Sequence, residues 1–364
     1  MAARLLTPKV LLRGFELFML ASLIGMAGLL IYGNDTGAVL DAIGRLHWGW
    51  LLVGVGLASL DWFGGGLRLW VLARQVHRPV SLKGMILAGG MGAWASYITP
   101  VNSGAGPMII YSMRRYGIPV PVAITTTLMS FVATVAFFAL AGPLAILLGA
   151  GRSLGAHGVV LGLSLYDLFL GSLGIFVGLA ALLLGVMIFP RLIANGVHRL
   201  ATWLGQGRPK LASKLESFRA GIDQAHESMV AFNTPKGWFN LFIATIISGP
   251  SHANKLLAGY VTLRALDIHV NFVDVLLLQT LITFLLYFAP TPGASGIAEV
   301  ISAAVMSIYV PRELTPLYTI IWRCILSYFT LAFGFGVFSS WVRAGLKAID
   351  ASGSAASEPM PEPT

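Results

Sequence analysis

The stretch YFAPTPGASG, residues 287–296, decides the fold of this chain. It interrupts apolar sequence with Pro290, Pro292, Gly293 and Gly296. Proline removes a backbone hydrogen bond and glycine lowers helix stability, so a helix that enters this stretch is expected to end there. The sequence therefore predicts a helix break in the middle of an apolar segment.

A second stretch, YITPVNSGAGP at residues 97–107, has the same pattern. In both stretches a tyrosine precedes a proline by three residues and a glycine follows that proline by six, since Pro100 leads to Gly106 as Pro290 leads to Gly296. A pattern that recurs at long spacing indicates an internal repeat.

The composition places both breaks in a membrane protein. Hydrophobic residues make up 56% of the 364 positions and charged residues 11%, against about 25% charged in soluble domains. Several apolar runs reach the roughly 20 residues that cross about 30 Å of hydrocarbon as a helix. The apolar runs lie at about 14–32, 48–73, 84–98, 120–149, 159–189, 237–262, 275–289, 297–310 and 316–341.

We therefore expect one all-α polytopic membrane domain over residues 1–349. Irregular backbone is not viable in contact with lipid, so each break must be buried in protein or line a polar cavity. Re-entrant helical hairpins over 84–113 and 275–310 meet this condition and leave about six full spans. The two halves are then repeat A, about 48–149, and repeat B, about 237–341.

The basic residues predict the orientation. If 84–113 dips from the cytoplasm and 275–310 from the opposite side, most of the 24 Lys and Arg residues fall on the cytoplasmic side, as the positive-inside rule requires. Both termini are then cytoplasmic in an inner membrane, and the repeats have opposite orientations. Such inverted repeats with broken helices are typical of secondary transporters.

Two segments lie outside the spans. Residues 190–235 form a polar cytoplasmic elbow, in which apolar residues at helical spacing between 211 and 222 favour an interfacial helix; a solvated connection is the alternative. The tail over 350–364 has the composition of a disordered segment.

Charges inside spans are expensive, at about 2.5 to 3.5 kcal/mol each at a helix centre. Among them are Asp61, Arg68, Lys255, Glu299 and Arg323. Arg68 and Lys255 precede the two breaks by similar stretches and suit an anionic headgroup, although Arg68 could instead extend to the membrane surface. Arg323 is either a phosphate ligand or the partner of Glu299 in a structural ion pair.

The breaks themselves supply further candidates. A half-helix is expected to start after Gly106 and after Gly296, and the positive end of a helix binds anions. The glycines could equally serve close packing, the tip Asn, Ser and Thr side chains could satisfy freed backbone groups, and His252 suits packing or proton coupling. The candidate substrate-binding residues are Arg68, Lys255, Arg323, Glu299, Asn102, Ser103, Gly104, Gly106, Pro290, Pro292, Gly293, Ser295, Gly296 and His252.

No catalytic set is evident. The chain has no zinc-protease, phosphate-loop or dinucleotide fingerprint, and the single Cys324 excludes an internal disulfide and a cysteine-based metal site. The basic residues are spread over short loops, which does not favour nucleic acid. We expect no enzyme, no cofactor and no metal.

The second break and the last span carry a family resemblance. Pro290-x-Pro292-Gly293-x-x-Gly296-x-x-Glu299, with Trp322-Arg323 and Tyr328 further on, resembles the flippase-like membrane region of lysylphosphatidylglycerol synthases, and Ser103-Gly104-Ala105-Gly106 before Tyr111 is similar too. The resemblance spans roughly residues 14–345 and covers the membrane part alone, without the aminoacyl-transferase domain. It implies that lipids such as aminoacylated phosphatidylglycerol or polyprenyl-linked sugars are translocated or accommodated. Ala294 and Pro107 depart from the family pattern.

The leading hypothesis is a flippase-like transporter that moves an anionic, aminoacylated or polyprenyl-linked lipid between leaflets by alternating access. One alternative is a transporter of a small anionic solute. Another is an accessory subunit that binds lipid for a separately encoded lipid-modifying enzyme without moving it. The expected partners are a membrane lipid, the bilayer, and either a second copy of the chain or that enzyme.

Overall fold

The computed structural model describes residues 8–33, 35–147, 159–160, 163–189, 199, 230, 232–287 and 289–356. This part of the chain is helical except for one two-residue antiparallel pair, β1 (Val159–Val160) with β2 (Leu163–Ser164). Almost all of the elbow predicted at 190–235 lies outside the described residues.

Five helical segments are long and apolar enough to cross a bilayer, which identifies a membrane protein. They are Arg13–Gly33, Trp48–Val76, Val120–Leu144, Tyr166–Ile188 and Arg312–Trp341. The first four lie in α2 (Pro8–Gly33), α4 (Trp48–Val76), α7 (Val120–Leu147) and α9 (Leu165–Ile188). The fifth comprises η3 (Arg312–Leu314), α16 (Thr315–Arg323), the π-helical turn η4 (Cys324–Tyr328) and part of α17 (Phe329–Ala356).

The sixth span, expected at 237–262, is not one helix. The chain forms α12 (Pro235–Ser251) and α13 (Ala253–Ala265), separated at His252. Pro250, in the last turn of α12, has no N–H to donate, so the helix ends just after it.

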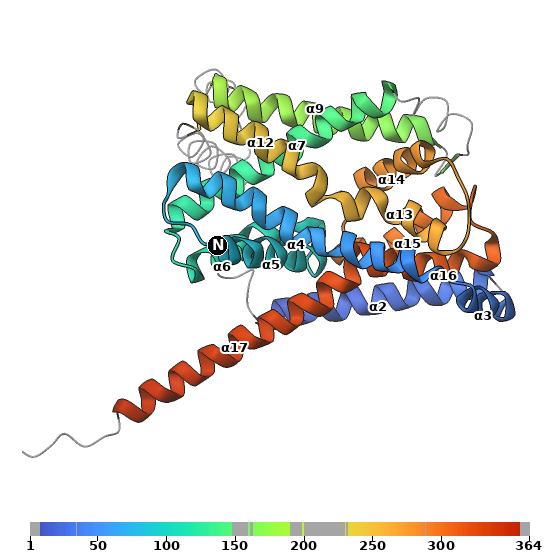
Figure 1. Ribbon diagram of the computed structural model, residues 1–364, viewed down its shortest axis with the longest axis horizontal. Helices are drawn as coiled ribbons and strands as arrows, with labels where there is room; N and C mark the ends of the chain where they lie inside the picture. Colours follow the sequence, from blue (N-terminus) through green and yellow to red (C-terminus); the bar gives the residue numbers. More distant parts are fainter. Residues whose placement is uncertain are drawn as a thin grey trace, which may run out of the picture.

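Both Pro/Gly stretches end their helices, as their composition predicts. In the first, α5 (Leu82–Tyr97) leads through η1 (Pro100–Asn102) to α6 (Ala105–Arg115); in the second, α14 (Phe272–Tyr287) leads through η2 (Pro292–Ala294) to α15 (Ile297–Met306). We call these hairpin 1 and hairpin 2, and η1 and η2 their tips. The hairpins lie toward opposite ends of the molecule (Figure 1), and their tips contact each other.

Helix α4 runs antiparallel to α12 and α13. The Gln75 side chain accepts a hydrogen bond from Asn240 Nδ2 over 2.8 Å near one end, and His47 N donates to Ala265 O over 3.0 Å at the other. A Cβ on Gly64 would lie 2.7 Å from the Cα of Ser251, so glycine permits this close approach. This packing joins the two halves along the centre of the molecule.

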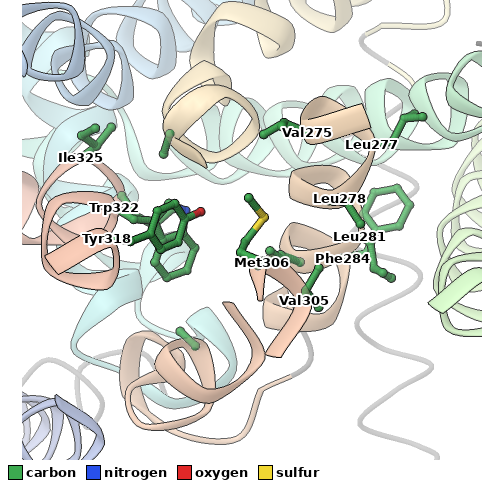
Figure 2. Close-up of a cluster of buried hydrophobic side chains, with 14 of the residues drawn as sticks. Val275, Leu277, Leu278, Leu281, Phe284, Val305, Met306, Tyr318, Trp322 and Ile325 are labelled. Atoms are coloured by element: carbon green, nitrogen blue, oxygen red, sulfur yellow. The ribbon is translucent and has the colours of Figure 1, made fainter. Parts of the chain in front are cut away.

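The largest apolar core joins hairpin 2 to the last span. Figure 2 shows Tyr318 and Trp322 on one side of Met306, with Leu278 and Phe284 on the other. Within this core Trp322 Nε1 donates to the buried Gln279 side chain over 3.0 Å, which satisfies a polar group that water does not reach.

The chain termini and linkers add two features. The short helix α3 (Thr36–Gly44), which the sequence analysis did not predict, connects α2 to α4. Helix α17 projects away from the body of the molecule (Figure 1) and continues to Ala356, past residue 350 where the tail was expected to begin.

Candidate functional site

The two hairpin tips line a small, partly open cavity together with α13, α14 and the π-helical turn. Its volume is about 50 Å³, room for a few water molecules. The lining residues are Tyr97, Val101, Asn102, Lys255, Thr283, Leu286, Tyr287, Ala289, Thr291, Gly293, Ala294 and Leu326. Both breaks that the sequence singles out therefore contribute to one site.

Lys255 supplies the positive charge of this cavity. Its side chain is 18% exposed, and its Nζ donates to Asp61 Oδ1 over 2.9 Å. The ammonium group also lies 5.8 Å from the centre of the Tyr97 ring. Because an ammonium group has three hydrogens, the contact with Asp61 leaves Lys255 able to donate to another acceptor.

Asp61 is held by groups from several helices. Its Oδ2 accepts from Asn254 Nδ2 over 2.9 Å and lies 3.0 Å from Tyr97 Oη and 3.4 Å from Thr330 Oγ1. The carboxylate is 4% exposed, and charge-assisted bonds of this kind stabilise a buried anion. Asp61 therefore ties α4, α5, α13 and α17 together behind the cavity.

The two tyrosines of the repeated pattern both line the cavity. Tyr97 Oη lies 2.7 Å from Leu326 O as well as near Asp61, and its single proton serves one of these acceptors at a time. Tyr287 packs edge-on against Phe138 and Phe176. The tyrosine that precedes each break is thus a site residue that the candidate set lacked, although the repeated pattern contained the signal.

The tips use left-handed backbone conformations. The φ angles are 50° at Val101, 54° at Asn102, 55° at Gly293 and 56° at Ala294. Such angles are strained for residues other than glycine, and strained residues cluster at binding and switch sites. Three of the four non-glycine residues with positive φ in the described chain are in these tips.

The polar tip side chains divide into two kinds. Thr291 Oγ1 donates to Ser295 O over 2.9 Å, and Ser295 Oγ donates to Pro292 O, so these hydroxyls satisfy freed backbone groups. Asn102 lines the cavity and has no side-chain hydrogen bond within the described chain. Its amide is therefore available to a ligand.

Glu299 and Arg323 form a fully buried ion pair at hairpin 2. Arg323 Nε donates to Glu299 Oε1 over 3.0 Å, and both side chains are 0% exposed. Arg323 Nη1 also lies 3.3 Å from Gly293 O, while Glu299 Oε2 accepts from Gly296 N over 2.8 Å. The pair thus binds the backbone of hairpin 2 at two points, at Gly293 within the tip and at Gly296 just after it.

This geometry changes one expectation about the half-helix ends. The Gly296 N–H at the start of α15 is already bound by Glu299, so the anion at this positive helix end is a side chain of the protein itself. In hairpin 1 the half-helix starts at Ala105, so Gly106 lies in its first turn instead of before it.

Ser22 extends the ion pair toward α2. Its hydroxyl donates to Glu299 Oε1 over 2.6 Å and lies 2.6 Å from Tyr328 Oη. Arg323 is also placed over two rings, 5.3 Å from the centre of Phe18 and 5.7 Å from that of Tyr328. Nη2 of Arg323 has no hydrogen-bond partner among the described residues.

Arg68 occupies a separate polar site between α4, α7 and α12. Its Nη1 donates to Thr134 Oγ1 over 2.6 Å and to Ser248 Oγ over 3.0 Å. Within the described chain it has no carboxylate in ion-pair distance, and its Nε is unpaired. Arg68 is therefore a half-buried cation with neutral partners.

His252, at the break between α12 and α13, is buried among aromatic rings. Its Nδ1 lies 2.7 Å from Ser248 O, and its ring stacks on Phe137 and meets Phe138 edge-on. These contacts match the packing alternative.

The candidate residues from the sequence therefore separate into groups. Lys255, Asn102 and Gly293 line the central cavity. The others do not line it: they are Arg68, Glu299, Arg323, Ser103, Gly104, Gly106, Pro290, Pro292, Ser295, Gly296 and His252. The described residues contain no group of three His, Cys, Asp or Glu side chains that could hold a metal ion.

Comparison with known proteins gives one family. The model of the family described as the lysylphosphatidylglycerol synthase TM region matches residues 17–334. No curated protein matched the sequence in a direct search. The matched range contains both hairpins, the central cavity and the Glu299–Arg323 pair.

Proposed function

The chain belongs to the family of the lysylphosphatidylglycerol synthase transmembrane region, and from this premise we propose that it carries a lipid with an anionic headgroup between the leaflets of a bilayer. The family indicates a role connected with membrane lipids. The observation that carries the finer proposal is Lys255, a partly exposed cation in a cavity where two broken hairpins meet.

The headgroup phosphate replaces Asp61 as the partner of Lys255. Asn102, which lines the same cavity, donates to the same phosphate in this proposal, and strong hydrogen bonds to a charged oxygen are worth about 1.5 to 3 kcal/mol each. The cavity of about 50 Å³ is too small for a phospholipid headgroup, so binding requires the tips to move apart. The acyl chains remain in the bilayer throughout.

The charged groups near the two hairpin tips and on α4 favour an anionic ligand. Arg68, Lys255 and Arg323 are cations, whereas Asp61 and Glu299 are the carboxylates, which leaves one positive charge in excess among these five groups. Buried charge is stable only when it is compensated. A headgroup with one negative charge at Lys255 brings the sum of these five charges to zero, while Arg68 keeps its hydroxyl partners.

The hairpins enter the membrane from opposite sides in this proposal. Four basic residues lie toward one end of the molecule: Lys83 at the start of α5, Arg114 and Arg115 at the end of α6, and Lys236 at the start of α12. At this end Asn240 donates to Gln75, and Arg115 lies over the ring of Trp341. The positive-inside rule makes this end cytoplasmic, in an inner membrane. The halves then form an inverted repeat, in which separation of the tips toward either side alternates access.

A small anionic solute is the second candidate. The cavity has room for a small ion, whereas a lipid headgroup requires it to widen. In both cases the protein acts by binding and movement, without catalysing a reaction.

The test measures headgroup transfer in proteoliposomes. Phosphatidylglycerol with a nitrobenzoxadiazole-labelled headgroup is reconstituted with the protein, and dithionite then reduces the label only in the outer leaflet. We expect Lys255→Ala to slow transfer about tenfold or more, because it removes one charged hydrogen bond. Lys236→Ala, which removes an exposed cation at the start of α12, should leave transfer unchanged.

Equal transfer by the wild type and by Lys255→Ala would contradict the lipid proposal. Uptake of radiolabelled phosphate into protein-containing vesicles, with no exchange of labelled lipid, would favour the small-solute alternative.

A further inference from the structure

A second, larger hollow lies between α2 and α15, away from the central cavity. It has a volume of about 690 Å³ and is lined almost wholly by apolar surface. Small residues open it on both sides, with Ala21, Gly25 and Gly28 on α2 and Ala303 and Ala304 on α15. We call it the α2–α15 groove.

The groove is about as long as one leaflet of the hydrocarbon layer is thick. Its lining runs from Ala21 to Tyr32 on α2 and from Gly296 to Ser307 around α15. At the helical rise of 1.5 Å per residue, each side is about 16 Å long, which is about half of a 30 Å hydrocarbon layer. One end lies next to the tip of hairpin 2, because Gly296 directly precedes α15 just after that tip, and the other lies at the end of α2.

At the end of the groove formed by the end of α2, a cation lies beside an aromatic ring. Arg312 Nε donates to Tyr32 O over 2.6 Å, and its guanidinium group lies 4.4 Å from the centre of the Tyr32 ring. Arg312 is exposed, and its two terminal nitrogens have no partner in the part of the chain that the structure describes. Tyrosine and arginine at a helix end are typical of the membrane–water interface, and these nitrogens suit a phosphate.

We propose that the α2–α15 groove binds one phospholipid of the bilayer, with an acyl chain in the groove and the phosphate on Arg312. The apolar lining, the depth of one leaflet and the positive charge at the interfacial end all match such a molecule. This site does not depend on the transport proposal, since it shares no lining residue with the central cavity.

A larger residue at Gly28 should fill part of the groove without displacing its neighbours. A Cβ on Gly28 would meet no atom within 4 Å, so a leucine there extends into open space. Gly56 on α4 is exposed and has equally open surroundings, but it lies outside the groove. Gly28→Leu and Gly56→Leu are therefore a matched pair that differs in location alone.

The experiment uses the full chain in nanodiscs that contain phosphatidylglycerol with a photoreactive diazirine in its acyl chain. After irradiation, mass spectrometry maps the labelled residues. We expect strong labelling of α2 and α15 around the groove in the wild type and in Gly56→Leu. Labelling there should fall to the level of other lipid-facing surfaces in Gly28→Leu, and Arg312→Gln should weaken it without entering the groove.

Two results would overturn the proposal. Labelling that is no stronger at the groove than at exposed Leu140 or Val177 would indicate ordinary surrounding lipid. Absence of lipid label at the groove, together with disulfide-linked dimers of a Gly28→Cys variant in a Cys324→Ser background, would indicate that a second copy occupies it. Neither result bears on Lys255, so transport and groove binding are tested separately.

Discussion

Val101 illustrates how the tips store strain in single residues. This β-branched residue has a φ of 50° and is 56% exposed at the cavity. The left-handed conformation costs about 1 to 2 kcal/mol for a residue with a Cβ, whereas Asn tolerates it better. We interpret the strain as a store of energy that separation of the tips releases.

Replacement of Val101 should therefore stabilise the resting conformation. Val101→Asn is expected to raise the free energy of unfolding by about 1 kcal/mol, and Val101→Ala should lie between it and the wild type. Thermal unfolding in detergent, followed by size-exclusion chromatography, measures the order. A Val101→Asn protein less stable than Val101→Ala would contradict this explanation.

We expect replacement of Glu299 to lower the stability of the protein, because this residue is part of a buried ion pair. Glu299→Ala leaves the fully buried Arg323 without its anion and removes the acceptor of Gly296 N. Loss of one partner from a buried pair costs about 3 to 5 kcal/mol. The same thermal assay should show this loss for Glu299→Ala and none for Glu313→Ala, which removes an exposed carboxylate. Similar stability of both variants would refute the structural role of the pair.

Asp61 competes with the headgroup for Lys255 in the mechanism proposed above. Asp61→Asn keeps oxygen and nitrogen atoms for Tyr97 and Asn254 but removes the negative charge, so Lys255 becomes free. We expect tighter binding of phosphatidylglycerol, by about tenfold, together with slower transfer because release is slower.

Native mass spectrometry of lipid-titrated protein measures this affinity. The double variant Asp61→Asn with Lys255→Ala is the control, because it should show no gain. If Asp61→Asn binds phosphatidylglycerol no more tightly than the wild type, the exchange mechanism is wrong, whether or not the protein transports lipid.

At the level of elements, the sequence predicted the breaks whose cause is local. Pro100, Pro290 and the neighbouring glycines end their helices by simple backbone chemistry, and both breaks are where the pattern placed them. The break at His252 was missed because a single proline, here Pro250, is tolerated within a membrane-spanning helix. The π-helical turn at 324–328 has no local signal; within it, Leu326 O accepts hydrogen bonds from Tyr97 and Asn254, which are distant in sequence.

The orientation of the hairpins is testable with single cysteines. In a Cys324→Ser background, cysteines at Lys83 and Arg114, on the open side of hairpin 1, should react with a membrane-impermeant maleimide from one face only. Cysteines at Asn271 and Ser307, on the open side of hairpin 2, should react from the other. Reaction of Lys83→Cys and Arg114→Cys from opposite faces would show that hairpin 1 crosses the membrane.

For the whole molecule, the candidate site was only partly predictable from sequence. Lys255, Asn102 and Gly293 could be found because charges and breaks in apolar sequence are conspicuous. Asp61 was recognised as a buried charge, but its partnership with Lys255 depends on the antiparallel contact of two distant helices. Arg68 and Lys255 resemble each other in sequence position, yet packing separates them into two environments.

Arg68, which has no carboxylate partner within the described chain, leads to a prediction about selectivity. Arg68→Gln removes a cation whose partners are two hydroxyl groups, so no carboxylate is left unpaired. We expect the ratio of phosphatidylglycerol to phosphatidylcholine transfer to fall while both transfers remain measurable. An unchanged ratio would show that Arg68 does not contribute to the choice of lipid.

The contact between the two tips also affects whether ions can pass through the protein. Because the tips of hairpins 1 and 2 contact each other around a cavity of about 50 Å³, we expect the resting molecule to offer hydrated ions no continuous path between the tips. A cell that produces this protein in large amounts should therefore keep its membrane voltage, and planar bilayers that contain it should show no steady conductance.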